Sequence, residues 1–362
     1  MDPIDLIRPE IATLSAYKPV VPFDTLAAAL GKAPERIIKL DANENPYGPP
    51  VCVQEVLAQL AYVNLYPDPE TGALREALSE QTGVPADQLL VGAGSDELLS
   101  LTARLFLSQG DAILDCPPTF GMYAFFASVM GARVLTAPRR EDFSLDLDFV
   151  EATVARERPK LLFVASPNNP DGAWLPDADL ARLLALPLVV VLDEAYIEFA
   201  EAPGRIRQVV DHENLIVLRT FSKWAGLAGL RVGYGAFPAA LMPHLLKIKE
   251  PYTVSTAAQE AALAVLQDAD YLAMHRARVI AERERMRALL VALPFMDVLP
   301  SQSNFLLCRV LGRDAGALKL ALEQEGILVR YFNKPGMDAY LRIGVGRPDQ
   351  TDVLVAALRR LG

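Results

Sequence analysis

Short apolar runs alternate with polar loops through the middle of the chain, and no other feature restricts the possible folds as strongly. Most of these runs end in loops rich in glycine, proline, amides or carboxylates, and they cover residues 89–91, 112–114, 134–135, 161–165, 188–192, 215–218 and 233–236. Segments long enough for helices or long crossover connections separate most of them. This alternation predicts an α/β fold with a mostly parallel, seven-stranded type of β-sheet sandwiched by helices.

The rest of the chain predicts two further units around this sheet. Residues 1–40 contain five prolines and a short helical stretch, and we expect an N-terminal arm that packs with the last part of the chain. A helical pattern runs from residue 255 to about 293, and shorter strand and helix patterns follow it. We therefore predict a large domain over residues 41–250 and a smaller α+β domain over residues 251–362.

The composition excludes several other classes of protein. The 362-residue chain has a net charge of -10, which argues against a general nucleic-acid-binding protein. We find no apolar run long enough for a membrane span and no basic-then-apolar leader, so we expect neither membrane insertion nor secretion. The three cysteines and three histidines are too scattered for a disulfide framework, a metal site or a catalytic triad. We expect a cytoplasmic protein without a metal.

A single lysine, Lys223, lies in the turn after the apolar run 215–218, and a segment rich in glycine and alanine follows it. In a compact chain this lysine is either a charge at the sheet edge or a reactive amine in a cleft. A buried lysine loses its proton readily, which suits it to Schiff-base chemistry. Ser222 and Arg231 would add a hydroxyl and a guanidinium group that bind a phosphate. A reactive lysine beside a phosphate site suggests pyridoxal phosphate as the cofactor.

Other strand-end loops carry groups that this cofactor needs. The amide of Asn168 follows the run 161–165, and the carboxylate of Asp193 follows the run 188–192. Loops at the carboxyl ends of parallel strands meet at one edge of a sheet, so these residues can converge with Lys223. A carboxylate that stays ionised beside the protonated pyridine nitrogen supports the ring as an electron sink. Asp193 suits this role, although it could instead cap the following segment.

Further residues would complete the cofactor site. The ring oxygen needs hydrogen-bond donors, which Asn168 and Tyr196 can supply. The ring needs an aromatic side chain such as Phe120 on one face and a small one such as Ala195 on the other. The glycine turn before Ser95 presents backbone N–H groups at the start of a predicted helix, which is a natural position for the phosphate.

The same glycine turn permits a rival interpretation. Gly92 and Gly94 resemble the first two glycines of a dinucleotide-binding fingerprint, and Asp115 follows at about the expected distance of ~20 residues. The third glycine position holds Glu97, whose bulk and charge would crowd the helix–strand contact and repel a pyrophosphate. We therefore favour the pyridoxal phosphate site over an NAD-dependent oxidoreductase.

Motifs along nearly the whole chain, from about residue 14 to the end, resemble the fold-type I aminotransferases that use pyridoxal phosphate. Within that family the resemblance is closest to the histidinol-phosphate aminotransferase subfamily, which the Asn-Glu-Asn-Pro opening indicates. The residues that carry the resemblance are 41–48, 66–68, 94–97, 166–170, 193–196, 220–234 and 342–346. The resemblance implies a homodimer whose two active sites lie at the subunit interface.

The resemblance also implies roles for individual residues. Tyr66 would reach the cofactor phosphate of the other subunit, and Tyr17 would close over a substrate. Arg342 resembles the family's substrate-anion arginine. Arg330 lies where a second, phosphate-binding arginine is expected, although it could be a surface charge on a strand. The matching motifs add Asp96 to the cofactor-binding residues, and Asn43 and Asn168 to the substrate-binding residues.

One position departs from the family pattern. Asp171 stands where the family usually has threonine before the glycine. A carboxylate at this position would either alter a hydrogen bond of the loop or add negative charge near the substrate. Neither consequence changes the cofactor assignment.

The implied activity is reversible amino transfer from L-histidinol phosphate to 2-oxoglutarate in histidine biosynthesis, which gives imidazole acetol phosphate and L-glutamate. Lys223 would act as the general base that moves a proton from the substrate carbon to the cofactor carbon. Asp193 and Tyr196 would be the other catalytic residues. The alternatives are an aromatic amino-acid aminotransferase, in which Arg342 binds a carboxylate, a decarboxylase of threonine phosphate, and a catalytically silent protein that binds pyridoxal phosphate.

Overall fold

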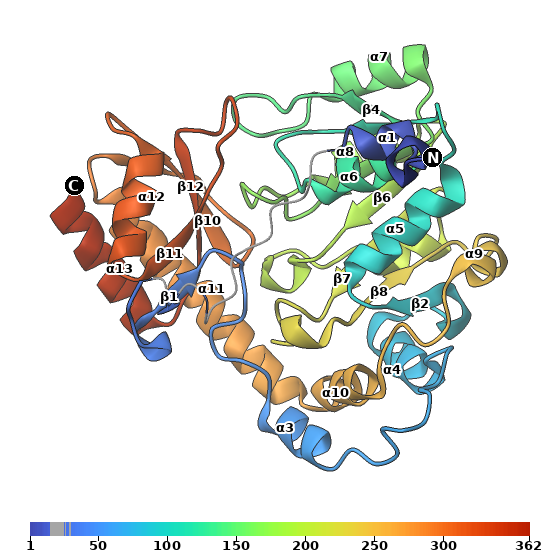
Figure 1. Cartoon of the computed structure of the whole chain (residues 1–362), viewed down its shortest axis with the longest axis horizontal. Helices are drawn as coiled ribbons and strands as arrows, with labels where there is room; N and C mark the ends of the chain where they lie inside the picture. Colours follow the sequence, from blue (N-terminus) through green and yellow to red (C-terminus); the bar gives the residue numbers. More distant parts are fainter. Residues whose placement is uncertain (15–24, 26, 29) are drawn as a thin grey trace.

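The computed structural model describes residues 1–14, 25, 27, 28 and 30–362. Figure 1 shows two lobes, each built on one β-sheet, and the long helix α11 (Ala269–Val291) leads from the larger lobe to the smaller one. The central part of the chain forms the larger lobe, and the C-terminal part forms most of the smaller lobe. Among the described residues, no helix is both long and apolar enough to cross a membrane.

The larger sheet has seven strands in the order β2-β8-β7-β6-β5-β3-β4. Their bounds are β2 (Leu89–Gly92), β3 (Ala112–Asp115), β4 (Arg133–Thr136), β5 (Leu161–Ala165), β6 (Val189–Asp193), β7 (Leu215–Thr220) and β8 (Gly233–Ala236). Strand β8 runs antiparallel to both of its neighbours, and the other neighbouring pairs are parallel. The predicted α/β fold with a mostly parallel sheet is confirmed, and the apolar runs of the sequence are its strands.

Residues that alternate along these strands bury their side chains on opposite faces of the sheet. In β5, Leu162 and Val164 belong to one hydrophobic cluster, and Leu161 and Phe163 belong to another. The first cluster includes residues of α4 (Gly72–Thr82), α7 (Leu147–Glu157), α8 (Asp177–Leu184) and α10 (Thr256–Gln267), and α3 (Val51–Ala58) packs on α10. The second includes residues of α5 (Ser95–Phe106), α6 (Met122–Val129) and α9 (Met242–Ile248). Burial on both faces explains the continuous apolar runs.

The smaller sheet has five strands in the order β1-β11-β12-β10-β9. Their bounds are β1 (Ile38–Leu40), β9 (Met296–Val298), β10 (Phe305–Val310), β11 (Ile327–Tyr331) and β12 (Tyr340–Gly344), and α12 (Ala315–Gln324) and α13 (Pro348–Leu361) accompany them. Strand β1 pairs in parallel with β11, so a segment near the N-terminus completes the C-terminal sheet. Strand β9 was not predicted from the sequence.

The helical pattern predicted over residues 255–293 is divided into α10 and α11. The break falls at Asp268, whose Oδ1 atom accepts a hydrogen bond from Tyr271 N at 3.2 Å. This carboxylate caps the free N–H groups at the start of α11, which favours a new helix here over one continuous helix.

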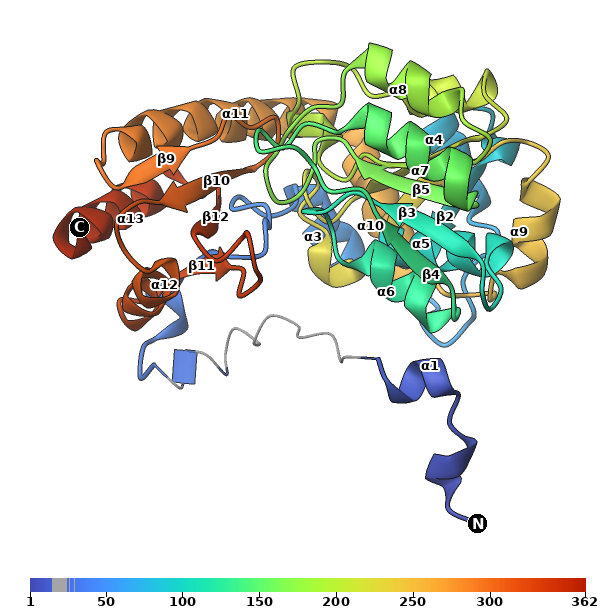
Figure 2. The same ribbon diagram turned by 90° about the horizontal axis from the view of Figure 1, so that it is seen from above.

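The described parts of the N-terminal segment lie beside different lobes, with α1 (Pro9–Ala12) on the side of the larger lobe and β1 in the smaller one (Figure 2). Helix α1 packs against α6, and Arg8 Nη2 donates a hydrogen bond to Val129 O at 2.6 Å. Strand β1 lies in the smaller sheet. Within the helix predicted at residues 24–30, the described residues 25, 27 and 28 are helical, and residues 24, 26 and 29 lie outside the described residues. The division of the chain into an arm and two domains at residues 40 and 250 stays a prediction.

Candidate active site

The carboxyl ends of β5, β6 and β7 lead into loops that line a cavity of about 190 Å³. Ligand sites of open α/β sheets commonly lie at this edge. Most residues predicted to bind the cofactor line the cavity, namely Ser95, Asp96, Phe120, Asp193, Tyr196, Ser222, Lys223 and Arg231. The exceptions are Asn168 and Tyr66, which lie elsewhere.

Lys223 lies in the turn after β7, and its Nζ atom donates a hydrogen bond to Ala42 O at 3.0 Å. The pKa of this amine is lowered to about 8, mainly because burial disfavours the charged form and also because Arg342 repels it. Roughly half of the amine is therefore neutral at a pH of about 8. A neutral amine in a cavity can act as a nucleophile and as a base, so the structure favours a reactive amine over a charge at the sheet edge.

Asp193 ends β6 and places its carboxylate at the wall of the cavity. Its Oδ2 atom accepts a hydrogen bond from Tyr123 Oη at 2.7 Å, and its Oδ1 atom accepts one from Ala195 N at 3.0 Å. Burial raises the pKa of this carboxyl to about 6, against the effect of these two hydrogen bonds. Asp193 is therefore mostly ionised at neutral pH and can hold a cationic group of a ligand.

Asp193→Asn is expected to change how the stability of the ligand-free protein depends on pH. The pKa of Asp193 in the folded protein, about 6, lies above the ordinary value of 3.8, so the folded protein binds more protons than the unfolded chain between these values. The contribution of Asp193 to the free energy of unfolding therefore falls as the pH rises through this window. Urea unfolding of both proteins across the window should show the fall in the wild type and not in the variant. If the free energy of unfolding changed with pH in the same way in both proteins, the assignment of a raised pKa to Asp193 would be contradicted.

The N-terminus of α5 and Arg231 form one end of the cavity. Gly94 has a φ of +79°, and a Cβ atom there would lie 2.6 Å from Arg231 Nη2, so only glycine fits this turn. Arg231 Nη2 lies 3.1 Å from Asp96 Oδ2, and Nη1 donates to Ser222 Oγ at 3.4 Å. Free backbone N–H groups at a helix start, a hydroxyl and a guanidinium group are the donors that a phosphate needs.

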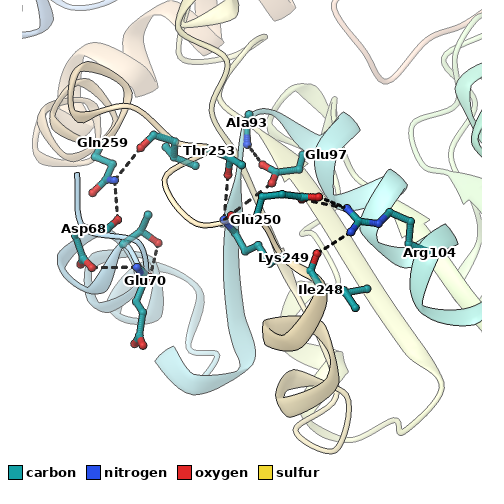
Figure 3. Close-up of polar contacts among 12 residues, drawn as sticks. Asp68, Glu70, Ala93, Glu97, Arg104, Ile248, Lys249, Glu250, Thr253 and Gln259 are labelled. Atoms are coloured by element: carbon teal, nitrogen blue, oxygen red, sulfur yellow. Dashed lines mark hydrogen bonds and ion pairs between the residues drawn. The ribbon is translucent and has the colours of Figure 1, made fainter. Parts of the chain in front are cut away.

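Glu97 has a structural role beneath this turn, as Figure 3 shows. Its Oε2 atom accepts a hydrogen bond from Ala93 N, and its Oε1 atom lies 4.0 Å from Lys249 Nζ. Lys249 in turn donates to Thr253 Oγ1 at 3.0 Å. Glu97 therefore occupies the space that the third glycine of a dinucleotide fingerprint would leave open, which weakens the rival interpretation further.

The cavity is lined by Asn169 and not by Asn168. The Nδ2 atom of Asn169 donates to Tyr196 Oη at 3.4 Å. The side chain of Asn168 is fully buried, and its amide bonds to Thr119 and Asp171. The assignment of Asn168 to the cofactor and the substrate is therefore corrected, because the second of two adjacent amides faces the cavity.

Tyr66 does not line the cavity of its own chain. Its side chain is 82% exposed and stacks on Tyr252, with ring centroids 4.6 Å apart. The loop is anchored by Asp68, whose carbonyl oxygen accepts a hydrogen bond from Gln259 Nε2 at 3.0 Å (Figure 3). The action of Tyr66 in another subunit stays a prediction. The other predicted tyrosine, Tyr17, lies outside the described residues.

Arg342 contacts a residue of the cavity wall. Its Nη1 atom donates to Asn169 Oδ1 at 2.6 Å, and its Nη2 atom donates to Asp41 O at 2.7 Å. Arg330 is the register partner of Arg342 in the antiparallel pair of β11 and β12. Directly paired residues have side chains on the same face of a sheet, so both guanidinium groups lie on one face. Such a pair attracts an anion with more than one charge.

Asn43 is buried behind the cavity wall and does not line the cavity. Its Nδ2 atom donates a hydrogen bond to Tyr196 Oη at 3.1 Å. Asn43 instead lines a neighbouring pocket together with Glu44. Its direct contact with a substrate stays a prediction, and its side chain bonds to the cavity residue Tyr196.

Asp171 belongs to the loop after β5 and is 1% exposed. Its Oδ1 atom accepts a hydrogen bond from Ala173 N at 2.6 Å, and its Oδ2 atom accepts one from Asn168 Nδ2. Burial raises the pKa of this carboxyl. Asp171 does not line the cavity. Of the two consequences expected for an aspartate at this position, it therefore has the altered hydrogen bond of the loop and does not place a charge on the cavity wall.

Four polar residues of the cavity were not predicted from the sequence, and these are Glu44, Tyr123, Asn169 and Thr220. Tyr123 holds Asp193, and Thr220 Oγ1 donates to Ser222 Oγ at 2.9 Å. Spacing is the one signal for Tyr123, because it follows Phe120 by three residues near a predicted helix start and can face the same side. Thr220 has no signal beyond its position at the end of a strand.

The chain is similar to known aminotransferases over nearly its full length. A family model described as aminotransferase class I and II matches residues 35–358. Histidinol-phosphate aminotransferase 1, chloroplastic, of Arabidopsis thaliana is 50% identical over 355 residues, which cover 98% of this chain and 85% of the relative. Histidinol-phosphate aminotransferase of Roseiflexus castenholzii is 50% identical over 367 residues, which cover 98% of each chain. The crystal structure of histidinol-phosphate aminotransferase from Sinorhizobium meliloti in complex with pyridoxal-5'-phosphate has a TM-score of 0.88 and 30% identity, and covers 98% of each chain.

Proposed function

The chain belongs to the class I and II aminotransferases, and we propose that it transfers the amino group of L-histidinol phosphate to 2-oxoglutarate. The products are imidazole acetol phosphate and L-glutamate, and the reaction is a step of histidine biosynthesis. The observation that carries the proposal is the position of Lys223 and Asp193 on the wall of one cavity. Relatives of that activity, 50% identical over nearly the whole chain, support the choice of substrate.

The cavity fits pyridoxal 5'-phosphate as the cofactor. Ser222, Arg231 and the first N–H groups of α5 would hold its phosphate, and the turn at Gly94 leaves room for it because a Cβ atom there would collide with Arg231. Asp193 would pair with the pyridine nitrogen, and Lys223 would bond to the aldehyde carbon. Phe120 and Ala195 would cover the ring faces, while Asn169 and Tyr196 would donate to the ring oxygen.

Each residue of the site then has a chemical task. The bound cofactor supplies an electron sink for the pair left behind when the substrate carbon loses its proton. The ionised carboxylate of Asp193 keeps a proton on the pyridine nitrogen, and Tyr123 orients that carboxylate. Once the amino group of the substrate has displaced Lys223 from the cofactor, its Nζ atom, with a pKa of about 8, would accept the proton of the substrate carbon and pass it to the cofactor carbon.

Arg330→Ala is expected to lower kcat/KM for L-histidinol phosphate by roughly 10- to 100-fold, because a charge-assisted hydrogen bond to the substrate phosphate is lost. The value for phenylalanine, which carries no phosphate, should change much less. Steady-state kinetics with both amino donors measures this difference. It also tests the proposed function against the aromatic amino-acid aminotransferase.

Arg309→Ala is the matched control, because this arginine lies on strand β10 of the same sheet and is exposed. It should leave both kcat/KM values unchanged. A wild-type protein that prefers phenylalanine, or an Arg330→Ala variant that loses both activities equally, would contradict phosphate recognition at this position.

We also infer a homodimer with shared active sites and small-molecule substrates. The loop that carries Tyr66 exposes further apolar side chains, which are Tyr62, Val63 and Leu65. An exposed apolar patch of this kind favours a protein interface, and Tyr66 would then contact the cofactor phosphate of the other subunit. We propose a cytoplasmic location, which the three free cysteines support.

A further inference from the structure

Asn43 has a contact with the active site that its position in the sequence does not suggest. The residue is 2% exposed and adopts the left-handed conformation, with a φ of 56°. Its carbonyl oxygen accepts a hydrogen bond from Asn304 Nδ2 at 2.9 Å, so the residue before β10 of the smaller sheet holds the backbone of Asn43. Its amide Nδ2 lies 3.1 Å from Tyr196 Oη. The side chain is therefore held in one place, against the hydroxyl of Tyr196.

Tyr196 Oη accepts a second hydrogen bond from an amide, that of Asn169, whose Nδ2 atom lies 3.4 Å away. The orientation of that amide is determined by Arg342, because a guanidinium group can only donate and its Nη1 atom lies 2.6 Å from Asn169 Oδ1. The NH2 group of Asn169 must then face Tyr196. A phenolic oxygen accepts at most two hydrogen bonds, so with Asn43 and Asn169 as donors the hydroxyl proton is left to point into the cavity.

The orientation of the Asn43 amide therefore decides where the Tyr196 proton goes. An amide turned the other way would present Oδ1 to Tyr196 and accept this proton. In the structure Oδ1 is buried and, among the described residues, has no hydrogen-bond partner. Either orientation leaves one end of this buried amide unpaired at a cost in free energy, and the orientation in the structure is the one that lets the Tyr196 hydroxyl donate into the cavity.

We propose that Asn43 is a positioning residue that directs the Tyr196 hydroxyl proton toward the ring oxygen of the cofactor. The inference rests on the proposed use of pyridoxal 5'-phosphate. Asn43 acts by occupying one acceptor position of Tyr196 Oη, so that the hydroxyl donates into the cavity. A hydrogen bond to the ring oxygen stabilises its deprotonated form, which keeps the pKa of the bound cofactor low.

The experiment is a pH titration of the visible absorbance of the cofactor bound to the wild type, Asn43→Gly, Asn43→Ala and Tyr196→Phe. Tyr196→Phe should raise the midpoint by about one pH unit, because a hydrogen bond to the charged form is lost. Asn43→Gly accepts the positive φ without strain and should raise the midpoint in the same direction by a smaller amount. Asn43→Ala adds backbone strain, so it should lower Tm further than Asn43→Gly does. It should raise the midpoint by the same amount as Asn43→Gly.

The double variant Asn43→Gly/Tyr196→Phe separates positioning from a structural role. Its midpoint should equal that of Tyr196→Phe alone, because Asn43 acts only through the hydroxyl. An additive shift in the double variant, or Asn43 variants that change Tm and leave the midpoint in place, would overturn the inference. If the wild type carries no cofactor absorbance, the proposed function fails. If Tyr196→Phe shifts the midpoint and the Asn43 variants do not, only the role of Asn43 is contradicted.

Discussion

Replacing Lys223 with alanine is expected to lower the rate of amino transfer by at least about 10⁴-fold. The variant lacks the Nζ atom, which is needed both to bond to the cofactor and to transfer the proton. In the proposed reaction the Nζ atom of Lys223 would bond to the cofactor until the substrate amine displaces it, and it would then carry the proton between the two carbon atoms. Its position in the cavity and its pKa of about 8 suit both tasks. The loss should appear in kcat, since the proton transfer occurs after the substrate has bound. Steady-state assays of glutamate formation measure it.

Two controls make this result specific. Lys247→Ala removes an exposed lysine on α9 and should leave the rate unchanged. A small primary amine added to Lys223→Ala should restore part of the rate, because it can enter the cavity and accept the proton. A variant that retains more than about a tenth of the wild-type rate would exclude Lys223 as the base.

The second large effect is expected for Asp193→Asn, whose rate should fall by about 10³-fold. An ionised carboxylate in contact with the protonated ring nitrogen stabilises it by on the order of 4 kcal/mol at the effective dielectric constant of a buried site, and an amide lacks that charge. The ring then loses its proton and accepts electrons poorly. The burial of Asp193 and its two hydrogen bonds keep the carboxylate in one orientation. Glutamate formation at a fixed pH of about 8, where the carboxylate is ionised, measures the effect.

Tyr123→Phe is the matched control for Asp193. It removes the hydrogen bond to Asp193 Oδ2 and keeps the ring that stacks on Phe163, 5.2 Å away between centroids. The carboxylate remains, so the rate should fall by only about 10-fold. Equal losses in Tyr123→Phe and Asp193→Asn would mean that the geometry of this pair, and not the charge of Asp193, limits the reaction.

The architecture of the larger lobe follows from the sequence because its strands are buried on both faces. Apolar runs such as residues 161–165 and 215–218 then coincide with strands, and polar loops at their ends mark the ligand edge. The pairing of β1 with β11 could not be predicted in this way, since a three-residue strand carries little pattern and its partner lies at the other end of the chain. The antiparallel direction of β8 also leaves no local signal.

The site could be predicted where a residue lies at the end of a strand or in the turn directly after it and has a distinctive side chain. Asp193 and Lys223 meet both conditions. The sequence could not decide between Asn168 and Asn169, because adjacent residues of an irregular loop have no fixed period and only the hydrogen bonds of Asn168 show that it is turned inward. Asn43 lies against Tyr196 through tertiary packing alone.

A single-turnover reaction distinguishes amino transfer from L-histidinol phosphate from the alternative activities. Protein loaded with pyridoxal 5'-phosphate is mixed with L-histidinol phosphate in the absence of 2-oxoglutarate. We expect one equivalent of imidazole acetol phosphate per site, with the amino group retained on the cofactor until added 2-oxoglutarate releases an equal amount of glutamate. Lys223→Ala should give neither product at a comparable rate. Carbon dioxide release from threonine phosphate without an acceptor, or amino transfer from phenylalanine but not from L-histidinol phosphate, would contradict the proposed function.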